Sequence, residues 1–152
     1  MFIHTICLAL SKAKIPYAIV GGFAVALHGA VRGTVDVDLV IEWSLKNLQK
    51  TERVLKEMGL VSFHPINADS VFHFRDEYIK NRHMIAWNFY DPHNPTKQID
   101  IIINYDLSNA HTKTVRTREG SIKVLSRDDL IRMKEASGRP QDLADVKALE
   151  EL

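Results

Sequence analysis

The sequence has little cysteine, little net charge and no long apolar run, and each shortage argues against a class of protein. The single cysteine, Cys7, rules out an internal disulfide framework and argues against a cysteine-rich zinc site. A formal net charge of +1 is not the strongly basic signature of a dedicated nucleic-acid-binding protein. No segment reaches the roughly 20 apolar residues that a membrane span requires. We therefore expect a single soluble domain over residues 1–152 with no membrane contact.

The first 15 residues lack the features of a secretory signal. Their apolar run is short, contains His4 and has neither a basic start nor a small-residue cleavage site. The apolar side chains recur at helical spacing, so residues 3–14 are predicted to form an amphipathic helix that stops before Pro16. The expected location of the protein is the cytoplasm.

The rest of the sequence alternates between strand and helix patterns. Apolar runs predict strands at residues 17–20, 35–43, 83–91 and 97–105, and a hairpin whose turn and second strand lie at 118–126. Helical spacing predicts helices at residues 23–30, 45–59, 127–137 and 140–152, with Ser44 and Ser126 as N-caps and Gly138 as a stop. Residues 61–81 show no sustained period. This order favours an α/β or α+β domain with a mixed sheet.

Two aspartates interrupt one predicted strand, and a third interrupts another. Residues i and i+2 of a strand point to the same face, so Asp36 and Asp38 are expected to project together. Their like charges repel, and a divalent cation such as Mg²⁺ removes that repulsion. Asp100 stands among isoleucines and is the candidate third ligand, from an adjacent strand. The alternative is that these aspartates are only strand-end caps or surface residues.

A pair of glycines, Gly21 and Gly22, follows the first predicted strand and opens a helix. Backbone N–H groups at the start of a helix can hold a phosphate, and glycine lets a ligand approach the main chain closely. The same pair would also suit a tight strand-to-helix turn that binds nothing. The sequence contains neither the lysine of a Walker loop nor the third glycine of a dinucleotide-binding motif.

The combination of these motifs resembles the nucleotidyltransferase superfamily that includes DNA polymerase β. The motif R-x-T-x-D-x-D, which begins at Arg32 and includes Thr34, is most similar to the bacterial minimal nucleotidyltransferases, in particular to the AbiEii-type toxin group. The C-terminal run "MKEASGRPQDLADVKAL", which contains Lys134 and Arg139, resembles the closing signature of that group. The serine that follows the first glycine in many nucleotidyltransferases is a glycine here, Gly22.

The resemblance implies a small mixed sheet flanked by helices and an Mg²⁺-dependent transfer of a nucleotide from an NTP, such as ATP, to a hydroxyl group. It implies metal-binding and catalytic roles for Asp36, Asp38 and Asp100. It also implies nucleotide binding by six further residues: Gly21, Gly22, Arg32, Thr34, Lys134 and Arg139. An antitoxin protein is the partner that the toxin group implies.

Some roles in the closing helices stay open at this level. Lys134 and Arg139 either reach the phosphates or lie at solvated helix ends. Asp142 and Asp145 are expected to pair with Arg139 or Arg32 and to be structural, since Pro140 places Asp142 in a first helical turn, where a carboxylate is favoured.

The acceptor also stays open: it is RNA, a protein or a small molecule. A basic run at residues 111–123 either guides an RNA acceptor or is a solvated loop. Trp87 and Tyr90 are expected in the core, with base stacking as the alternative. His28 is expected to be a satisfied helix-end residue.

Three other functions compete with this interpretation. One is a small-molecule adenylyltransferase of the aminoglycoside-modifying type. Another is a nucleotide-binding regulatory module that has lost turnover, and the third is an α/β interaction domain.

Overall fold

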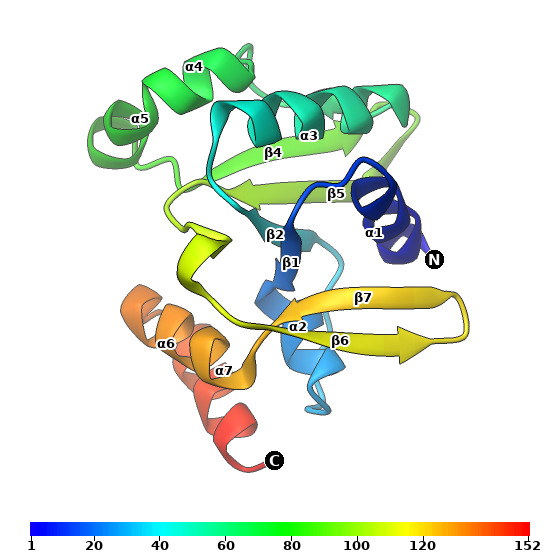
Figure 1. The fold of residues 1–152 in the computed structure, drawn as a ribbon. Helices are drawn as coiled ribbons and strands as arrows, with labels where there is room; N and C mark the ends of the chain where they lie inside the picture. The colour runs from blue at the N-terminus through cyan, green and yellow to red at the C-terminus, as the bar shows by residue number, and fades with distance from the viewer.

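The computed structural model describes all residues from 1 to 152 and contains one seven-stranded mixed sheet with helices around it (Figure 1). The strands lie in the order β3-β4-β5-β2-β1-β7-β6. Their bounds are β1 Tyr17–Val20, β2 Val37–Ile41, β3 Val61–Ser62, β4 Ala86–Asp91, β5 Asn94–Ile102, β6 Thr112–Thr117 and β7 Gly120–Leu125. Strand β2 runs parallel to β5, and β1 runs parallel to β7, whereas β1 and β2 are antiparallel. The predicted mixed sheet is confirmed.

Seven α-helices and one short 3₁₀ helix surround this sheet. Their bounds are α1 Phe2–Lys12, α2 Gly21–Leu27, α3 Leu45–Glu57, α4 Ala68–His73, α5 Arg75–Arg82, η1 Leu107–Asn109, α6 Arg127–Ser137 and α7 Pro140–Glu150. The predicted caps are confirmed, because Ser44 Oγ accepts from the N–H of Asn47 at 3.0 Å and Ser126 caps α6. Gly138 ends α6 at φ 65°, in the left-handed region that glycine adopts readily.

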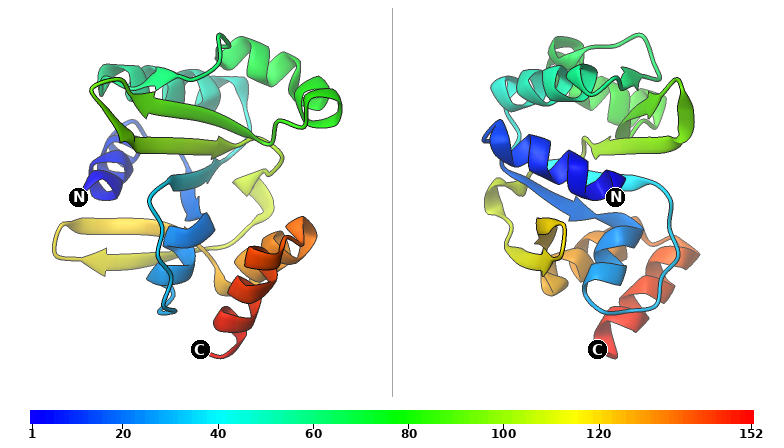
Figure 2. Two further views of the ribbon diagram at one scale, coloured as in Figure 1. Left: turned by 180° about the vertical axis from the view of Figure 1, so that it is seen from behind. Right: turned by 90° about the vertical axis from the view of Figure 1, so that its right-hand side faces the viewer.

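The two faces of the sheet are covered unequally. The right-hand view in Figure 2 shows α1 on one side of β1 and α2 on the other. Alternate residues of β4 and β5, among them Trp87, Phe89 and Ile99, are buried in the main core cluster. From behind, in the left-hand view, no helix covers the β4–β5 hairpin. One face of the hairpin thus packs in the core, and no helix covers the other face, which we call the open face of the sheet.

The bounds of several elements differ from the sequence expectations. Strand β2 begins at Val37 rather than at residue 35, so Asp36 precedes the strand and Val35 is exposed instead of facing the core. Helix α2 begins at Gly21, two residues early. Residues 92–93 form the tight turn between β4 and β5, and these strands begin at Ala86 and Asn94 instead of at residues 83 and 97. Residues 61–81, which show no sustained period, contain β3, α4 and most of α5. No helix of the chain is both long and apolar enough to cross a bilayer.

Candidate active site

A cleft of about 720 Å³ opens where β1 ends and β2 begins. Its volume falls in the range of small-molecule sites. Six of the nine residues predicted for the site line it: Gly21, Asp36, Asp38, Asp100, Lys134 and Arg139. The other three, Gly22, Arg32 and Thr34, do not line it. The cleft thus brings together residues from both ends of the chain.

Strand register places two acids of the cleft, Asp38 and Asp100, in one row. Asp38 on β2 is the direct partner of Asp100 on β5, and Asp100 is the direct partner of Asn88 on β4. Asn88 donates from Nδ2 to Oδ1 of Asp100 at 2.5 Å. The row Asp38–Asp100–Asn88 therefore crosses three neighbouring strands on the open face. The sequence analysis missed Asn88, because only the strand register shows that it stands beside Asp100.

The acids lie close enough to disfavour one another's charge. Burial, the charge of Asp100 and a hydrogen bond with it raise the pKa of Asp38 to about 7, and Asp36 adds to the effect while Lys134 opposes it. Burial and the charge of Asp100 also raise the pKa of Asp36. Although Asp36 precedes the strand, it remains part of this acidic group. Burial and the closeness of the three acids together disfavour their ionised forms.

These three acids fit a divalent cation by their chemistry. Carboxylate oxygens are the ligands that Mg²⁺ prefers, and a bound cation would offset the burial and the like charges that raise the pKa of Asp38. In the side-chain positions of this structure, no group of three or more His, Cys, Asp or Glu residues is arranged to hold a metal ion. To hold Mg²⁺, the side chains of Asp36, Asp38 and Asp100 would have to move closer together than they lie here.

The turn between β1 and α2 requires glycine for two reasons. Gly21 has φ +68°, and a Cβ placed there would lie 2.0 Å from Oδ2 of Asp38. At Gly22 a Cβ would meet Thr34 at 2.8 Å and Arg32 at 3.3 Å. The residues predicted to bind nucleotide thus separate into two groups. Gly21 faces the cleft beside Asp38, whereas Gly22, Thr34 and Arg32 pack against one another behind it.

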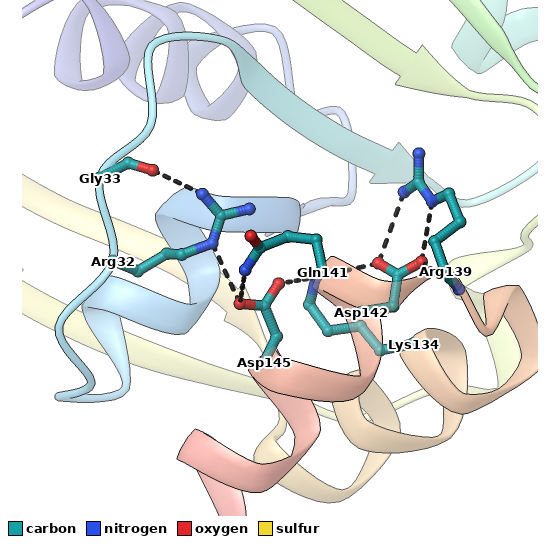
Figure 3. A network of polar contacts seen from close by, with 7 residues as sticks. All are labelled: Arg32, Gly33, Lys134, Arg139, Gln141, Asp142 and Asp145. Carbon is teal, nitrogen blue, oxygen red and sulfur yellow. Dashed lines mark hydrogen bonds and ion pairs between the residues drawn. The ribbon is translucent and has the colours of Figure 1, made fainter.

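A network of ion pairs joins the segment after α2 to the closing helices (Figure 3). Asp145 accepts from Lys134 Nζ at 2.8 Å, from Arg32 Nε at 3.0 Å and from the amide of Gln141 at 3.0 Å. Arg32 also donates to the carbonyl of Gly33. Asp145 is therefore the centre of this network, and the predicted pairing of Asp145 with Arg32 is confirmed.

Asp142 belongs to the same network through two cations. It accepts from Arg139 Nε at 2.8 Å, and Lys134 Nζ lies 3.6 Å away (Figure 3). The predicted pairing of Arg139 with Asp142 is confirmed, but Asp142 also lines the cleft. Lys134 is not at a solvated helix end, because its side chain is only 8% exposed. The Arg139 side chain is 71% exposed, but its guanidinium donates to the Asp142 carboxylate.

Trp87 and His28 lie outside the cleft. The Trp87 ring is buried and its Nε1 donates to Ser62 Oγ at 3.0 Å, so core packing is confirmed and base stacking by Trp87 is wrong. His28 Nε2 bonds the carbonyl of Leu125 at 2.8 Å, as expected for a satisfied helix-end histidine.

The basic run at residues 111–123 forms the β6–β7 hairpin, and none of its residues lines the cleft. The turn of the hairpin lies beside α1. Glu119 pairs there with the N-terminal ammonium of Met1 at 2.8 Å and with His4 Nδ1 at 2.9 Å.

Neither family models nor curated proteins match this sequence. Solved structures do resemble the fold. An antigenic nucleotidyltransferase-like protein from Paracoccidioides brasiliensis is 21% identical, with a TM-score of 0.62 over 97% of this chain and 72% of that chain. The chain has the nucleotidyltransferase fold.

Two antibiotic-related enzymes share this nucleotidyltransferase fold. ANT(2'')-Ia, solved in complex with adenylyl-2''-tobramycin, is 14% identical, with a TM-score of 0.61 over 97% of this chain and 84% of that chain. The lincosamide antibiotic adenylyltransferase LnuA, solved with lincomycin bound, is 15% identical, with a TM-score of 0.63 over 98% of this chain and 94% of that chain. At these identities the similarity establishes the fold, and the predicted fold class is confirmed.

Proposed function

We propose that the chain is an Mg²⁺-dependent nucleotidyltransferase that moves an NMP group from an NTP to a hydroxyl acceptor and releases pyrophosphate. The observation that carries this proposal is the pairing of Asp38 with Asp100 across β2 and β5, beside Asp36, in a cleft of small-molecule size. The likeness to adenylyltransferase structures supports the same reaction class.

The three acids Asp36, Asp38 and Asp100 have separable roles in this reaction. Asp36 and Asp38 would hold Mg²⁺ together with Asp100, and Asp100 would also accept the proton of the acceptor hydroxyl. Mg²⁺, when bound, neutralises the charge that develops on the attacking and leaving oxygens. Phosphoryl transfer needs little from the protein beyond positioning and charge neutralisation, so three carboxylates and a few cations are sufficient.

The remaining predicted residues would either contact the triphosphate or hold in place the residues that contact it. Gly21 faces the cleft and would offer its main chain to the phosphates. Arg139 lines the cleft and is exposed, and it would contact the phosphates by giving up its pairing with Asp142. Lys134 lines the cleft but is paired with Asp145, so it contributes a fixed positive charge. Gly22, Thr34 and Arg32 would act from behind the turn by holding its backbone in place.

The small-molecule alternative depends on which carboxylates of the cleft are free. The cleft also contains Asp129 and Asp142, but these pair with Arg132 and Arg139. The three acids of the metal site are then the only unpaired carboxylates in the cleft. A cationic sugar would have no further carboxylate to recognise, so we favour an acceptor without positive charge over an aminoglycoside.

The proposed reaction is tested with NTPs labelled at the α-phosphate and incubated with total RNA, total protein or antibiotic acceptors in Mg²⁺. The expected result is label on one acceptor class and release of pyrophosphate, both abolished in Asp38→Asn and retained in the exposed control Asp128→Asn. Metal-dependent NTP binding without any labelled acceptor or pyrophosphate would replace this proposal with the regulatory module.

We also propose a toxin role with an antitoxin partner, on the resemblance to the AbiEii-type group. Expression of the wild-type chain is expected to arrest bacterial growth, and Asp38→Asn is expected to restore it. Normal growth with the wild-type chain would remove the toxin role and leave the enzymatic proposal standing.

A further inference from the structure

A second hollow of about 440 Å³ lies on the open face of the sheet, outside the cleft. The side chains that carry its chemistry are Phe63, His64, Asn88, Tyr90, Pro95 and Gln98. They come from the segment after β3 and from the β4–β5 hairpin. This hollow is large enough for one small ring system with its substituents.

Strand register places the hollow directly beside the acids. The pair Asn88–Asp100 stands between two other pairs of β4 and β5 on this face. On one side the pair Ala86–Ile102 lines the cleft, and on the other side the pair Tyr90–Gln98 lines the hollow. Residues two apart on a strand are about 7 Å apart. Asp100 therefore has the cleft on one side and the hollow on the other.

The hollow offers ring faces and neutral polar groups. Phe63 is 68% exposed, and its ring meets those of Tyr90 at 6.1 Å and His64 at 5.1 Å in edge-to-face contacts. Edge-to-face packing leaves ring faces available for a ligand. Gln98 donates to the carbonyl of Pro95 at 3.1 Å, which leaves its amide oxygen as an acceptor. No Asp, Glu, Lys or Arg residue lines the hollow.

These features suit a flat, uncharged ring with hydrogen-bonding groups on its edge. Bases of unpaired nucleotides stack on aromatic side chains of an open sheet and bond amide groups through their edges. A cationic or anionic ligand would find no counter-charge among the lining residues. The chemistry therefore favours a nucleobase, either in a free nucleoside or at the end of a single strand.

We propose that this hollow is the acceptor subsite and that it holds the acceptor through a nucleobase. This inference rests on the proposed function. An acceptor base in the hollow places its sugar hydroxyl beside Asp100. The hydroxyl oxygen then bonds to the α-phosphorus of the NTP in the cleft, the bond to pyrophosphate breaks, and the proton passes to the Asp100 carboxylate. Asn88, which donates to Asp100, is the positioning residue that connects the two sites.

Calorimetry tests the subsite with adenosine, guanosine, cytidine, uridine and a mixed-sequence RNA hexamer as probes. The expected result is binding of at least one probe that weakens about tenfold or more in Phe63→Ala, because a stacking face is lost. Mg²⁺-dependent binding of NTP is expected to be unchanged in the same variant. Phe74→Ala is the matched control, since Phe74 is also an exposed aromatic residue but lies outside the hollow.

The outcomes separate this subsite from the proposed function. Equal binding of probes by wild type and Phe63→Ala, or no binding of any probe by wild type, would overturn the subsite, whatever the NTP titration shows. Absence of Mg²⁺-dependent NTP binding in wild type would instead overturn the proposed function. Among supporting outcomes, binding of the hexamer alone identifies a strand end, and binding of a nucleoside identifies a free nucleoside acceptor.

Discussion

At the scale of single residues, Gly21 shows how backbone and side-chain requirements coincide in this fold. Its positive φ disfavours any residue with a Cβ, and the space that a Cβ would need is occupied by the Asp38 carboxylate. The close approach of the turn to Asp38 is what keeps a bare main chain beside the acids. The glycine is therefore required by the site as well as by the turn.

Gly21→Ala is expected to lower stability and to abolish NTP binding, because the new methyl group displaces Asp38. Two matched variants separate the causes. Gly59 has φ +85° and open space, so Gly59→Ala should cost only the backbone strain of about 1–2 kcal/mol. Gly33 has neither constraint, so Gly33→Ala should be nearly neutral. Thermal unfolding that shows equal losses for Gly21→Ala and Gly59→Ala would contradict the contact with Asp38.

The sequence was sufficient to predict site residues where a charged residue interrupts an apolar run. Asp38 and Asp100 interrupt β runs, and the cleft contains both. Asn88 was not predictable, because an asparagine in a strand has no special meaning until the register places it opposite Asp100. Tyr90 is also informative: it is half-buried and lines the hollow, so the base-stacking alternative survives for this residue.

At the scale of elements, the junction of α6 and α7 depends on buried charge. Lys134 comes from α6, and its partners Asp142 and Asp145 come from α7. Arg32, which lies between α2 and β2, pairs with the same Asp145. Ion pairs in a buried setting hold geometry but become costly when one partner is removed. The closing helices are thus positioned against the segment between α2 and β2.

Lys134→Met is expected to lower the free energy of unfolding by about 2 kcal/mol, measured in urea. This is less than the roughly 3–5 kcal/mol of a fully unpaired buried charge, because Arg32 remains with Asp145 and Arg139 with Asp142. The same change at Lys147, an exposed lysine of α7, should have little effect. Equal losses in the two variants would show that the network does not hold the helices.

Because of Asp129 at the start of α6, the free energy of unfolding is expected to depend on pH. Burial opposes its ionisation, but the N–H of His111, the Arg132 guanidinium and the Ser126 hydroxyl outweigh this and lower its pKa to about 2. Since the folded pKa is below the unfolded value near 4, the stabilisation is present above pH 4 and is lost as the pH falls toward 2.

Urea unfolding of wild type and Asp129→Asn across this range measures the effect of Asp129 alone. The difference in free energy of unfolding should be about 1–2 kcal/mol at pH 6 and should shrink below pH 4. A difference that stays constant from pH 6 to pH 2 would show that the ionised carboxylate is not the stabilising form.

Elements with strong local signals were predictable, and those without were not. Helix α3 has a serine cap and a regular apolar stripe, and both were visible in the sequence. Helix α5 has no buried residue at all, so no apolar period marked it. The start of β2 was also misplaced, because the V-D-V-D alternation continues before Val37 although the pairing with β1 does not.

At the scale of the whole molecule, one row of polar residues divides the open face of the sheet. The cleft lies on one side of Asp38, Asp100 and Asn88, and the aromatic hollow lies on the other. This arrangement arises from the strand order, which places β2, β5 and β4 side by side. The order brings residues from the first and last quarters of the chain to the same cleft. Under the proposed function, Asp36 and the two acids of this row, Asp38 and Asp100, hold Mg²⁺ and NTP together.

The most direct measurement of that claim is calorimetric titration of the purified chain with each NTP, with and without Mg²⁺. NTP binding is expected to require Mg²⁺ in wild type and to be lost in the double variant Asp36→Asn/Asp38→Asn, with the fold retained because the variant removes mutual repulsion. Mg²⁺-dependent binding of NTP that survives the loss of both acids would contradict it.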